Sequence, residues 1–585
     1  MNGLNIETLV EQRNPDLYRR IPRFAHRWLF GFLDRALRLR DVRAFCTRSE
    51  GQRGVELLDE ALDFLDVSFS LTLRHRRRIP SEGRLVVVAN HPLGGVDALA
   101  LLRALLEVRP DVWIVANDVL TVLPGLSEFM LPVDLFSGRK QKSGLLAIEQ
   151  TLEREGAVVF FPAAEVDRPT WRGVQEGPWQ KGPVHFARKC SAPVLPVWVG
   201  GRNSRLFYAA SLLSRRLSML LLPRELFSQR GCTIVLKVGD PIPASAFAPG
   251  ALGAKVLTGL LRRHVQKIGQ GKRGLFRTET CIVHPVERRA LLAELAAAEL
   301  LGTTDDGKRI LLAGGESRAV LREIGRLREL TFRRVGEGTG QRLDLDDFDP
   351  HYRHIVLWDE RELEVAGAYR LAPCAEVMAE RGLAGLYAAS LFALSPAVQA
   401  LLPSAIELGR SFVQPRYWNS RALDSLWQGI GAYLAAHPEI RTLFGCVSIS
   451  NSYPEPAKDL IVRFYRTWFG AEEGAVVSPH PYVMTKAREQ WAAALLPGRN
   501  YRAELRVLKE TLREHGCAVP TLYKQYAELC TWGGVKFLGF GVDPNFGHCV
   551  DGFLVVDVAA ITPEKRARYI EAARLASERR GLQAS

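Results

Sequence analysis

Residues 85–99 read LVVVANHPLGGVDAL, and this stretch decides the class of fold. The β-branched run 85–89 predicts a buried strand, and a Pro-Leu-Gly-Gly turn separates it from a helix that begins near Asp97. Helical stretches such as 97–108 and 142–155 alternate with further short β-branched runs, which lie at 112–116, 157–161, 194–199 and 233–238. This alternation is typical of an α/β domain.

The turn after the first strand carries Asn90 and His91. Ligands of open α/β sheets bind at the carboxyl ends of the strands, so His91 stands where a reacting group is expected. A hydroxyl needs a base before it can attack a thioester, and a carboxylate such as Asp97 holds an imidazole in the tautomer that can serve. The pair indicates a general base, although an Asp here is also typical of a helix N-cap.

Four blocks in this region resemble, in order, those of the lysophospholipid acyltransferase family, whose first block is Asn-His-x-x-x-x-Asp. The other blocks are 124–139 (PGLSEFMLPVDLFSGR), 160–168 (FFPAAEVDR) and 192–197 (APVLPV). The resemblance spans roughly 65–245 and implies an O-acyltransferase with His91 and Asp97 as catalytic residues. It implies that substrate is bound by Asn90, Gly94, Gly95, Glu165, Arg168 and Arg172.

Two departures from the family pattern stand out. Five residues rather than four separate His91 from Asp97, and the glutamate of the third block comes two positions late, at Glu165. Both features are similar to the divergent branch called hemolysin-like acyltransferases. The longer loop leaves open whether Asp97 reaches the ring of His91.

The net charge of +14 belongs to the first half of the chain. Residues 1–280 contain 41 Lys and Arg against 27 Asp and Glu, whereas residues 281–585 contain 37 of each. A basic surface implies an anionic partner. In 17–46, arginines alternate with Leu, Phe and Trp at helical spacing, which favours an anionic lipid surface over nucleic acid. A second such segment is 206–223, and either segment is also consistent with a core-facing helix.

The composition is that of a globular protein, with 47% apolar and 24% charged residues. The nine cysteines are odd in number and never spaced CxxC, which argues against a disulfide framework or a cysteine-rich zinc site and fits a reducing compartment. The sequence shows no signal peptide and no apolar run long enough for a transmembrane helix. We expect a cytoplasmic protein that is peripheral on the inner face of the cytoplasmic membrane, with no metal or bound cofactor.

A chain of 585 residues is too long for one hydrophobic core. A Gly-rich, charged segment at 268–285 marks a linker, which predicts domains at 65–280 and 281–585. Residues 1–64, which precede the first domain, are predicted to form a membrane-associating helical segment. The second half predicts a helix at about 286–302, then a mixed, mostly antiparallel sheet flanked by helices. Its strands are expected at 309–313, 354–371 (a hairpin), 405–413, 442–449, 534–541 and 551–557, and its helices at 316–333, 420–435 and 454–469.

The densest group of reactive side chains in the second half is 407–417, ELGRSFVQPRY. Strand alternation places Glu407 and Ser411 on one face and Arg410 on the other, and we expect Glu407 to face the cleft. A second group, 344–354 (DLDDFDPHYRH), has four carboxylates in six residues. Such a run is either a solvated loop or a site for a cationic substrate.

The acyltransferases of the GNAT fold that make lyso-ornithine lipid are resembled by five stretches, at 319–332, 344–371 with the hairpin VAGAYRL, 405–417, 442–450 and 534–556. The resemblance spans about 300–560 and implies a catalytic Glu407, with substrate bound by Asp344, Asp347, Asp349, Arg410 and Ser411. The loop 414–419 lacks the glycines that cradle the pyrophosphate of coenzyme A in most proteins of this fold. An acyl-carrier protein is therefore the expected donor, docking on Arg416, Arg421 or the basic half of the chain.

Together the two halves resemble the bifunctional ornithine-lipid synthases. The resemblance implies N-acylation of ornithine with a 3-hydroxyacyl chain by the second half, followed by O-acylation of the lyso-lipid's 3-hydroxyl by the first. Coenzyme A thioesters are the other possible donors. One alternative is a phospholipid-remodelling acyltransferase fused to an N-acyltransferase for glycine, lysine or glutamine. The other is a non-enzymatic membrane-surface protein in which Asn90, His91 and Asp97 need not converge.

Overall fold

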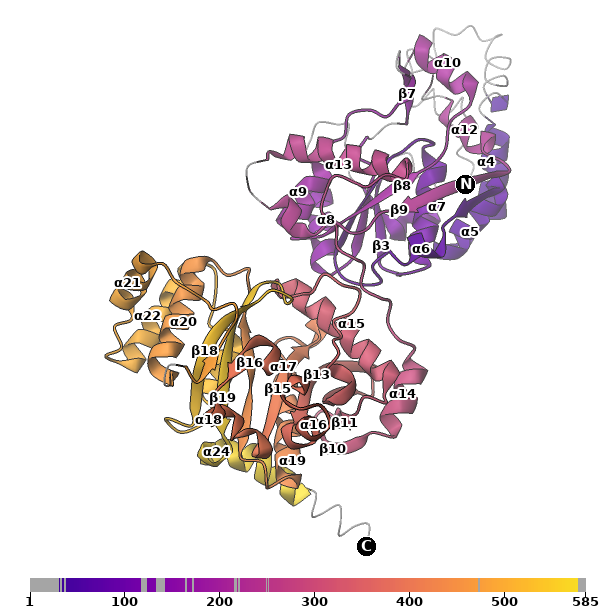
Figure 1. Ribbon diagram of the computed structural model, residues 1–585. Helices are drawn as coiled ribbons and strands as arrows, with labels where there is room; N and C mark the ends of the chain where they lie inside the picture. Colours follow the sequence, from indigo (N-terminus) through magenta and orange to yellow (C-terminus); the bar gives the residue numbers. More distant parts are fainter. Residues whose placement is uncertain are drawn as a thin grey trace. The chain divides into compact units, whose positions relative to one another are not determined.

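The computed structural model describes residues 31–576, except 32–33, 36–37, 117–123, 133–141, 164–165, 171–172, 215–217, 219–220, 249, 251 and 472–473. The chain folds as two compact units, Met1–His284 and Pro285–Ser585, and both combine helices with a large sheet (Figure 1). The predicted α/β class is confirmed. Most of the predicted segment 17–46 lies outside the described residues. Its end is described and forms part of helix α4 (Leu39–Arg48).

The sheet of the first unit has seven strands in the order β1-β9-β8-β2-β5-β3-β4. Its neighbours run parallel except for β8 and β9, which are antiparallel. The strands are β1 (Val67–Ser70), β2 (Leu85–Ala89), β3 (Val112–Ala116), β4 (Met130–Pro132), β5 (Ala157–Phe160), β8 (Val194–Val199) and β9 (Cys232–Val238). The central position of β2 explains its uninterrupted apolar sequence, because both of its faces are covered.

Alternate side chains of β2 enter two separate cores. Leu85 and Val87 pack with α5 (Gly54–Leu65) and α7 (Gly95–Leu106). On the opposite face, Val86 and Val88 pack with helices α8 (Lys142–Glu153), α9 (Gly182–Lys189) and α13 (Ala254–Gly269). The first unit is therefore a three-layer structure, with the sheet between two layers of helices (Figure 1).

The sheet of the second unit has eight strands in the order β10-β11-β12-β13-β15-β16-β19-β18. Every neighbouring pair is antiparallel except β15 and β16, so the predicted mostly antiparallel sheet is found. The strands are β10 (Glu299–Thr303), β11 (Arg309–Ala313), β12 (Arg353–Asp359), β13 (Glu364–Pro373), β15 (Ala405–Val413), β16 (Thr442–Ile449), β18 (Val535–Asp543) and β19 (Cys549–Asp557).

Helices cover both faces of this sheet as well. Ile355 and Leu357 of β12 pack on the side of α19 (Ala422–Ala436) and α20 (Glu455–Phe469). Val356 and Trp358 pack on the side of α14 (Arg288–Ala296) and α15 (Arg318–Val335), while a separate core lies around α16 (Cys374–Arg381) and α17 (Tyr387–Leu391).

Three helices that the sequence pattern did not indicate occupy the stretch between α20 and β18. They are α21 (Lys486–Leu495), α22 (Tyr501–Glu514) and α23 (Thr521–Ala527). Within the described ranges, no helix combines the length and the apolar character that crossing a membrane requires.

Candidate active sites

The first candidate site lies at the carboxyl end of β2, where His91 follows the strand. Its Nδ1 lies 2.9 Å from Oδ1 of Asp97, which is in the first turn of α7. The other oxygen of Asp97 accepts a hydrogen bond of 2.8 Å from the backbone N–H of Leu93, so this carboxylate also closes the loop. Asp97 therefore reaches His91 despite the extra loop residue, and Nε2 is the nitrogen that can accept a proton.

A glycine is required where this loop enters α7. Gly94 has φ of +88°, a region that favours glycine, and a Cβ there would lie 3.3 Å from Cγ1 of Val166. Gly95 begins the helix. The ring of Phe161 lies 4.4 Å from the ring of His91 between centroids. The two glycines thus shape the loop, and His91 contacts both an aromatic ring and a buried carboxylate.

Two further acids act on His91. Burial alone would lower the pKa of His91, but Asp97, with help from Glu176 and Asp167, raises it. Burial raises the pKa of Asp167 to about 6 and that of Glu176 to about 7. The sequence pattern did not single out either acid, although Asp167 lies within the third block. Buried acids with pKa values near neutral, close to a histidine at the end of a strand, are typical of functional sites.

A cavity of about 480 Å³ adjoins the end of β2 and is lined by polar side chains, among them Asn90, Asp167, Glu176, Arg262 and Arg263. Both polar atoms of the Asn90 side chain bond the backbone of Val199, at 2.8 and 2.7 Å. The amide of Asn90 thus ties β2 to β8 at the edge of the cavity, and its predicted contact with substrate stays a prediction.

The remaining predicted residues of this site have different fates. Arg168 donates to the hydroxyls of Ser211 and Ser218, and burial lowers the pKa of its guanidinium. Glu165 and Arg172 lie outside the described residues.

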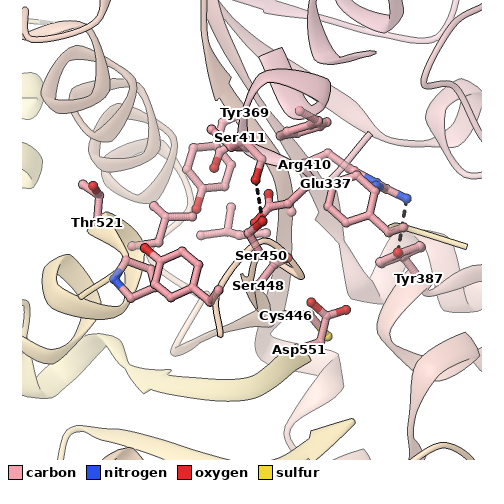
Figure 2. Close-up of a pocket in the computed structure, with 18 of the residues that line it drawn as sticks. Glu337, Tyr369, Tyr387, Arg410, Ser411, Cys446, Ser448, Ser450, Thr521 and Asp551 are labelled. Atoms are coloured by element: carbon pink, nitrogen blue, oxygen red, sulfur yellow. Dashed lines mark hydrogen bonds between the residues drawn. The ribbon is translucent and has the colours of Figure 1, made fainter. Parts of the chain in front are cut away.

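The second candidate site is a gap between two strands. β15 and β16 are parallel partners only over Ala405–Glu407 and Thr442–Phe444. At the next position the backbones still touch, since a Cβ on Gly445 would lie 2.0 Å from the carbonyl oxygen of Leu408. Beyond this point the strands separate, and a cavity of about 420 Å³ is lined by residues of both. Figure 2 shows this cavity with Arg410 and Ser411 of β15 and Cys446 and Ser448 of β16 among the residues around it.

A bulge changes the direction of side chains along β15. The register with β13 shifts where Ala368 pairs with Phe412 but Arg370 pairs with Gly409, and Arg410 has φ of +49°. Arg410 and Ser411 consequently both line the cavity. The guanidinium of Arg410 donates to the hydroxyl of Tyr387 at 3.2 Å (Figure 2). It also lies over the ring of Phe546.

The prediction that Glu407 faces the cleft is wrong. Its carboxylate is buried, accepts hydrogen bonds from the hydroxyl of Tyr352 at 2.5 Å and from the backbone N–H groups of Tyr387 and Ala388 at 3.1 and 2.6 Å, and is absent from the cavity lining. It therefore fixes the start of α17. The prediction that Glu407 and Arg410 lie on opposite faces of the strand is also wrong. The bulge brings the guanidinium of Arg410 to the hydroxyl of Tyr387, the residue whose backbone N–H donates to Glu407.

The acidic run at 344–349 neutralises arginines of the protein itself. Asp349 lies 2.7 Å from Arg328 and 3.2 Å from Arg370, and these cations hold its pKa low although burial acts to raise it. Asp344 is buried 3.7 Å from Arg410. Asp347 is exposed. Asp346 likewise contacts Arg370, so three of these four acids have arginine side chains as their cationic partners. The three acids predicted to bind substrate, Asp344, Asp347 and Asp349, do not line the cavity.

The loop proposed to receive the donor carries two exposed arginines with acidic neighbours. Arg416 forms ion pairs with Glu362 and Glu364 at 2.6 and 3.0 Å. Arg421 lies 3.4 Å from Asp305. An acidic carrier protein would have to exchange these surface ion pairs for its own, which costs little because exposed pairs are weak.

Two acids of the cavity lining were missed from the sequence. Glu337 follows the glycine that ends α15, and Asp551 sits in the middle of β19. The single Asp inside the otherwise apolar run 549–556, CVDGFLVV, was the available signal. Among the described residues, no group of three His, Cys, Asp or Glu side chains is arranged to hold a metal ion.

Comparison with known proteins assigns a family to each unit. Residues 8–265 match a family model described as acyltransferase, and residues 327–428 match one described as acetyltransferase (GNAT) domain. A protein of Bacteroides thetaiotaomicron named glycine N(alpha)-acyltransferase is 30% identical over 304 residues, which make up 50% of this chain and 89% of the relative. The chain belongs to the GNAT N-acyltransferases.

Two further relatives of this acyltransferase are informative, one named as an O-acyltransferase and one named for a different amino acid. A Bacteroides thetaiotaomicron protein named lyso-glycine lipid O-acyltransferase is 27% identical over 251 residues, which make up 42% of this chain and 90% of the relative. A Brucella abortus protein named L-ornithine N(alpha)-acyltransferase is 29% identical over 302 residues, 48% of this chain and 94% of the relative. The chain is thus an enzyme with N- and O-acyltransferase activities of the lipid–amino acid type, and the non-enzymatic alternative is excluded.

Proposed function

We propose that the enzyme makes ornithine lipid in two steps. The second unit transfers a 3-hydroxyacyl chain from an acyl-carrier protein to the α-amine of ornithine. The first unit then transfers a second acyl chain to the 3-hydroxyl of this lyso-lipid, with His91 as the base. The reaction takes place on the anionic inner face of the cytoplasmic membrane, to which the basic first half binds.

One observation carries the choice of ornithine. The cavity between β15 and β16 combines a guanidinium, Arg410, with two carboxyl groups, Glu337 and Asp551. An α-amino acid presents one carboxylate and one ammonium, which would occupy Arg410 and one acid. A second acid suits an amino acid with a second ammonium on its side chain.

Glycine is the second candidate, because relatives named for glycine lipids match both units. Lipid extracts of a host that expresses the chain distinguish the two. Ornithine lipid is phosphorus-free and ninhydrin-positive, since its side-chain amine stays free, whereas the amine of a glycine lipid is acylated. Mass spectrometry of the headgroup fragment decides between them, and no new amino-acid lipid at all would contradict the proposal.

A further inference from the structure

The cavity between β15 and β16 ends on the carboxylate of Asp551. This side chain is 4% exposed and comes from β19, where it pairs across the ladder with Ser448 of β16. The Ser448 hydroxyl bonds the carboxylate, while Oδ1 has no hydrogen-bond partner among the described residues. Buried polar atoms are nearly always satisfied in folded proteins, so an unsatisfied oxygen that lines a cavity points to a ligand group that donates to it.

Glu337 reaches the same cavity from a different element. Gly336, with φ of +80°, ends α15, and the chain then turns so that Glu337 lines the cavity. Burial raises the pKa of both acids to about 7, and the nearby charge of Asp551 adds to the effect on Glu337. At neutral pH each acid is therefore divided between its charged and neutral forms, and a bound ammonium would favour the charged form.

The guanidinium of Arg410 completes the cavity. Its side chain is 9% exposed, its two carboxylate neighbours Asp344 and Asp346 lie at 3.7 and 3.9 Å, and its Nε has no hydrogen-bond partner in the described structure. These distances are too long for strong hydrogen bonds, so the guanidinium keeps donors for a carboxylate.

We infer that Asp551 is the general base that takes the proton of the substrate α-ammonium, and that Glu337 binds the ammonium on the substrate side chain. The inference rests on the proposed function for the identity of the side chain, but the role of Asp551 is the same for any α-amino acid. Asp551 is the deeper acid, on the sheet beside the point where the strands separate, whereas Glu337 is in a loop.

The proton balance follows from the chemistry of aminolysis. Asp551 takes one proton from the ammonium, and the neutral amine attacks the thioester carbonyl. The tetrahedral intermediate collapses as the carbon–sulfur bond breaks, and the second proton of the attacking nitrogen goes to the thiolate. The products are the amide, the free thiol and a proton that Asp551 returns to water.

Several groups around Asp551 will influence its titration. They are Asp543 of β18, Glu337, Arg410, Tyr387, Cys446 and Tyr523. The acids raise the pKa of Asp551 and Arg410 lowers it.

The test uses the purified full chain with a 3-hydroxyacyl carrier-protein thioester and either ornithine or glycine, across the pH range in which Asp551 and the amine titrate. Asp551→Asn should reduce kcat by about 10²–10⁴-fold near neutral pH, the usual effect of removing a general base. The deficit should shrink at alkaline pH, because the amine is then already neutral. Asp551→Glu should restore part of the rate. Asp557→Asn, an exposed acid at the end of the same strand, is the matched control and should behave as wild type.

Glu337→Gln should raise KM for ornithine about tenfold or more, and by a clearly larger factor than it raises the KM of any glycine reaction. A deficit of Asp551→Asn that is equal at every pH would overturn the role of Asp551, and an equal rise of KM for both amino acids would overturn that of Glu337. If wild type acylates glycine alone, the proposal of ornithine and the role of Glu337 fail, while Asp551 is still tested with glycine. A chain that acylates neither amine overturns both.

Discussion

Replacing Glu407 by Gln should destabilise the second unit rather than remove a catalytic group. The carboxylate accepts three hydrogen bonds in a buried site, two at one oxygen and one at the other. A Gln amide has one accepting oxygen, so its NH₂ group would face either the N–H of Ala388 or the donors Tyr352 and Tyr387. Each lost hydrogen bond to a charged group costs about 1.5–3 kcal/mol, and we expect a loss of about 2–4 kcal/mol in the free energy of unfolding.

The assay is thermal unfolding of the full chain, followed by near-ultraviolet circular dichroism, together with the rate of amide formation below the transition. For a unit of this size, the loss corresponds to a fall in Tm of ~5 °C or more. Glu376→Gln, which alters an exposed glutamate bonded to Arg353, is the control and should change Tm little. The rate per folded molecule should fall less than about tenfold, because removing an acid–base group costs more. An unchanged Tm with abolished amide formation would contradict the structural role of Glu407 and indicate a catalytic one.

Three further predictions concern the first unit. His91→Ala should make lyso-lipid accumulate in cells while amide formation continues, as lipid extracts would show, and the loss of both lipids from a folded protein would contradict the division between units. Asp97→Asn should move the acid limb of kcat/KM for O-acylation to lower pH, since Asp97 raises the pKa of His91 and neutral His91 is the active form; an unmoved limb in the pH profile would contradict the pairing. In vesicle sedimentation, the full chain should bind anionic lipid at low salt and be released at high salt, because the charge excess lies in 1–280. Equal binding by residues 285–585 alone would argue against it.

Regular elements could be predicted because periodicity and burial agree in them. The hairpin at 354–371 and the strand at 442–449 were placed within a few residues of β12, β13 and β16. Helix α22 was overlooked although its apolar face is pronounced, because its charged residues outnumber its apolar ones. The edge strand β10 was included in a helix, as short strands with Ala and Leu neighbours carry little β signal.

The site was harder to predict for two physical reasons. Strand alternation assigns faces correctly only in a regular strand. The sequence ELGRSFV does not indicate that Arg410, which is not a glycine, adopts a positive φ in a bulge. The acids of the cavity are scattered, since Glu337 follows a helix and Asp551 lies more than 200 residues later. The His91–Asp97 pair could be found because both members belong to one strand–turn–helix unit.

The bulge in β15 divides one strand between two tasks. Up to Glu407 the strand anchors α17, and from Leu408 onward it forms a wall of the cavity. Deleting the bulge residue that follows Arg410 would restore strict alternation, and Arg410, three positions after Glu407, would then point to the opposite face, while the ladder up to Glu407 could still form. The bulge therefore decides which face the guanidinium occupies, and variants of this strand are better compared by whether they keep the bulge than by residue identity alone.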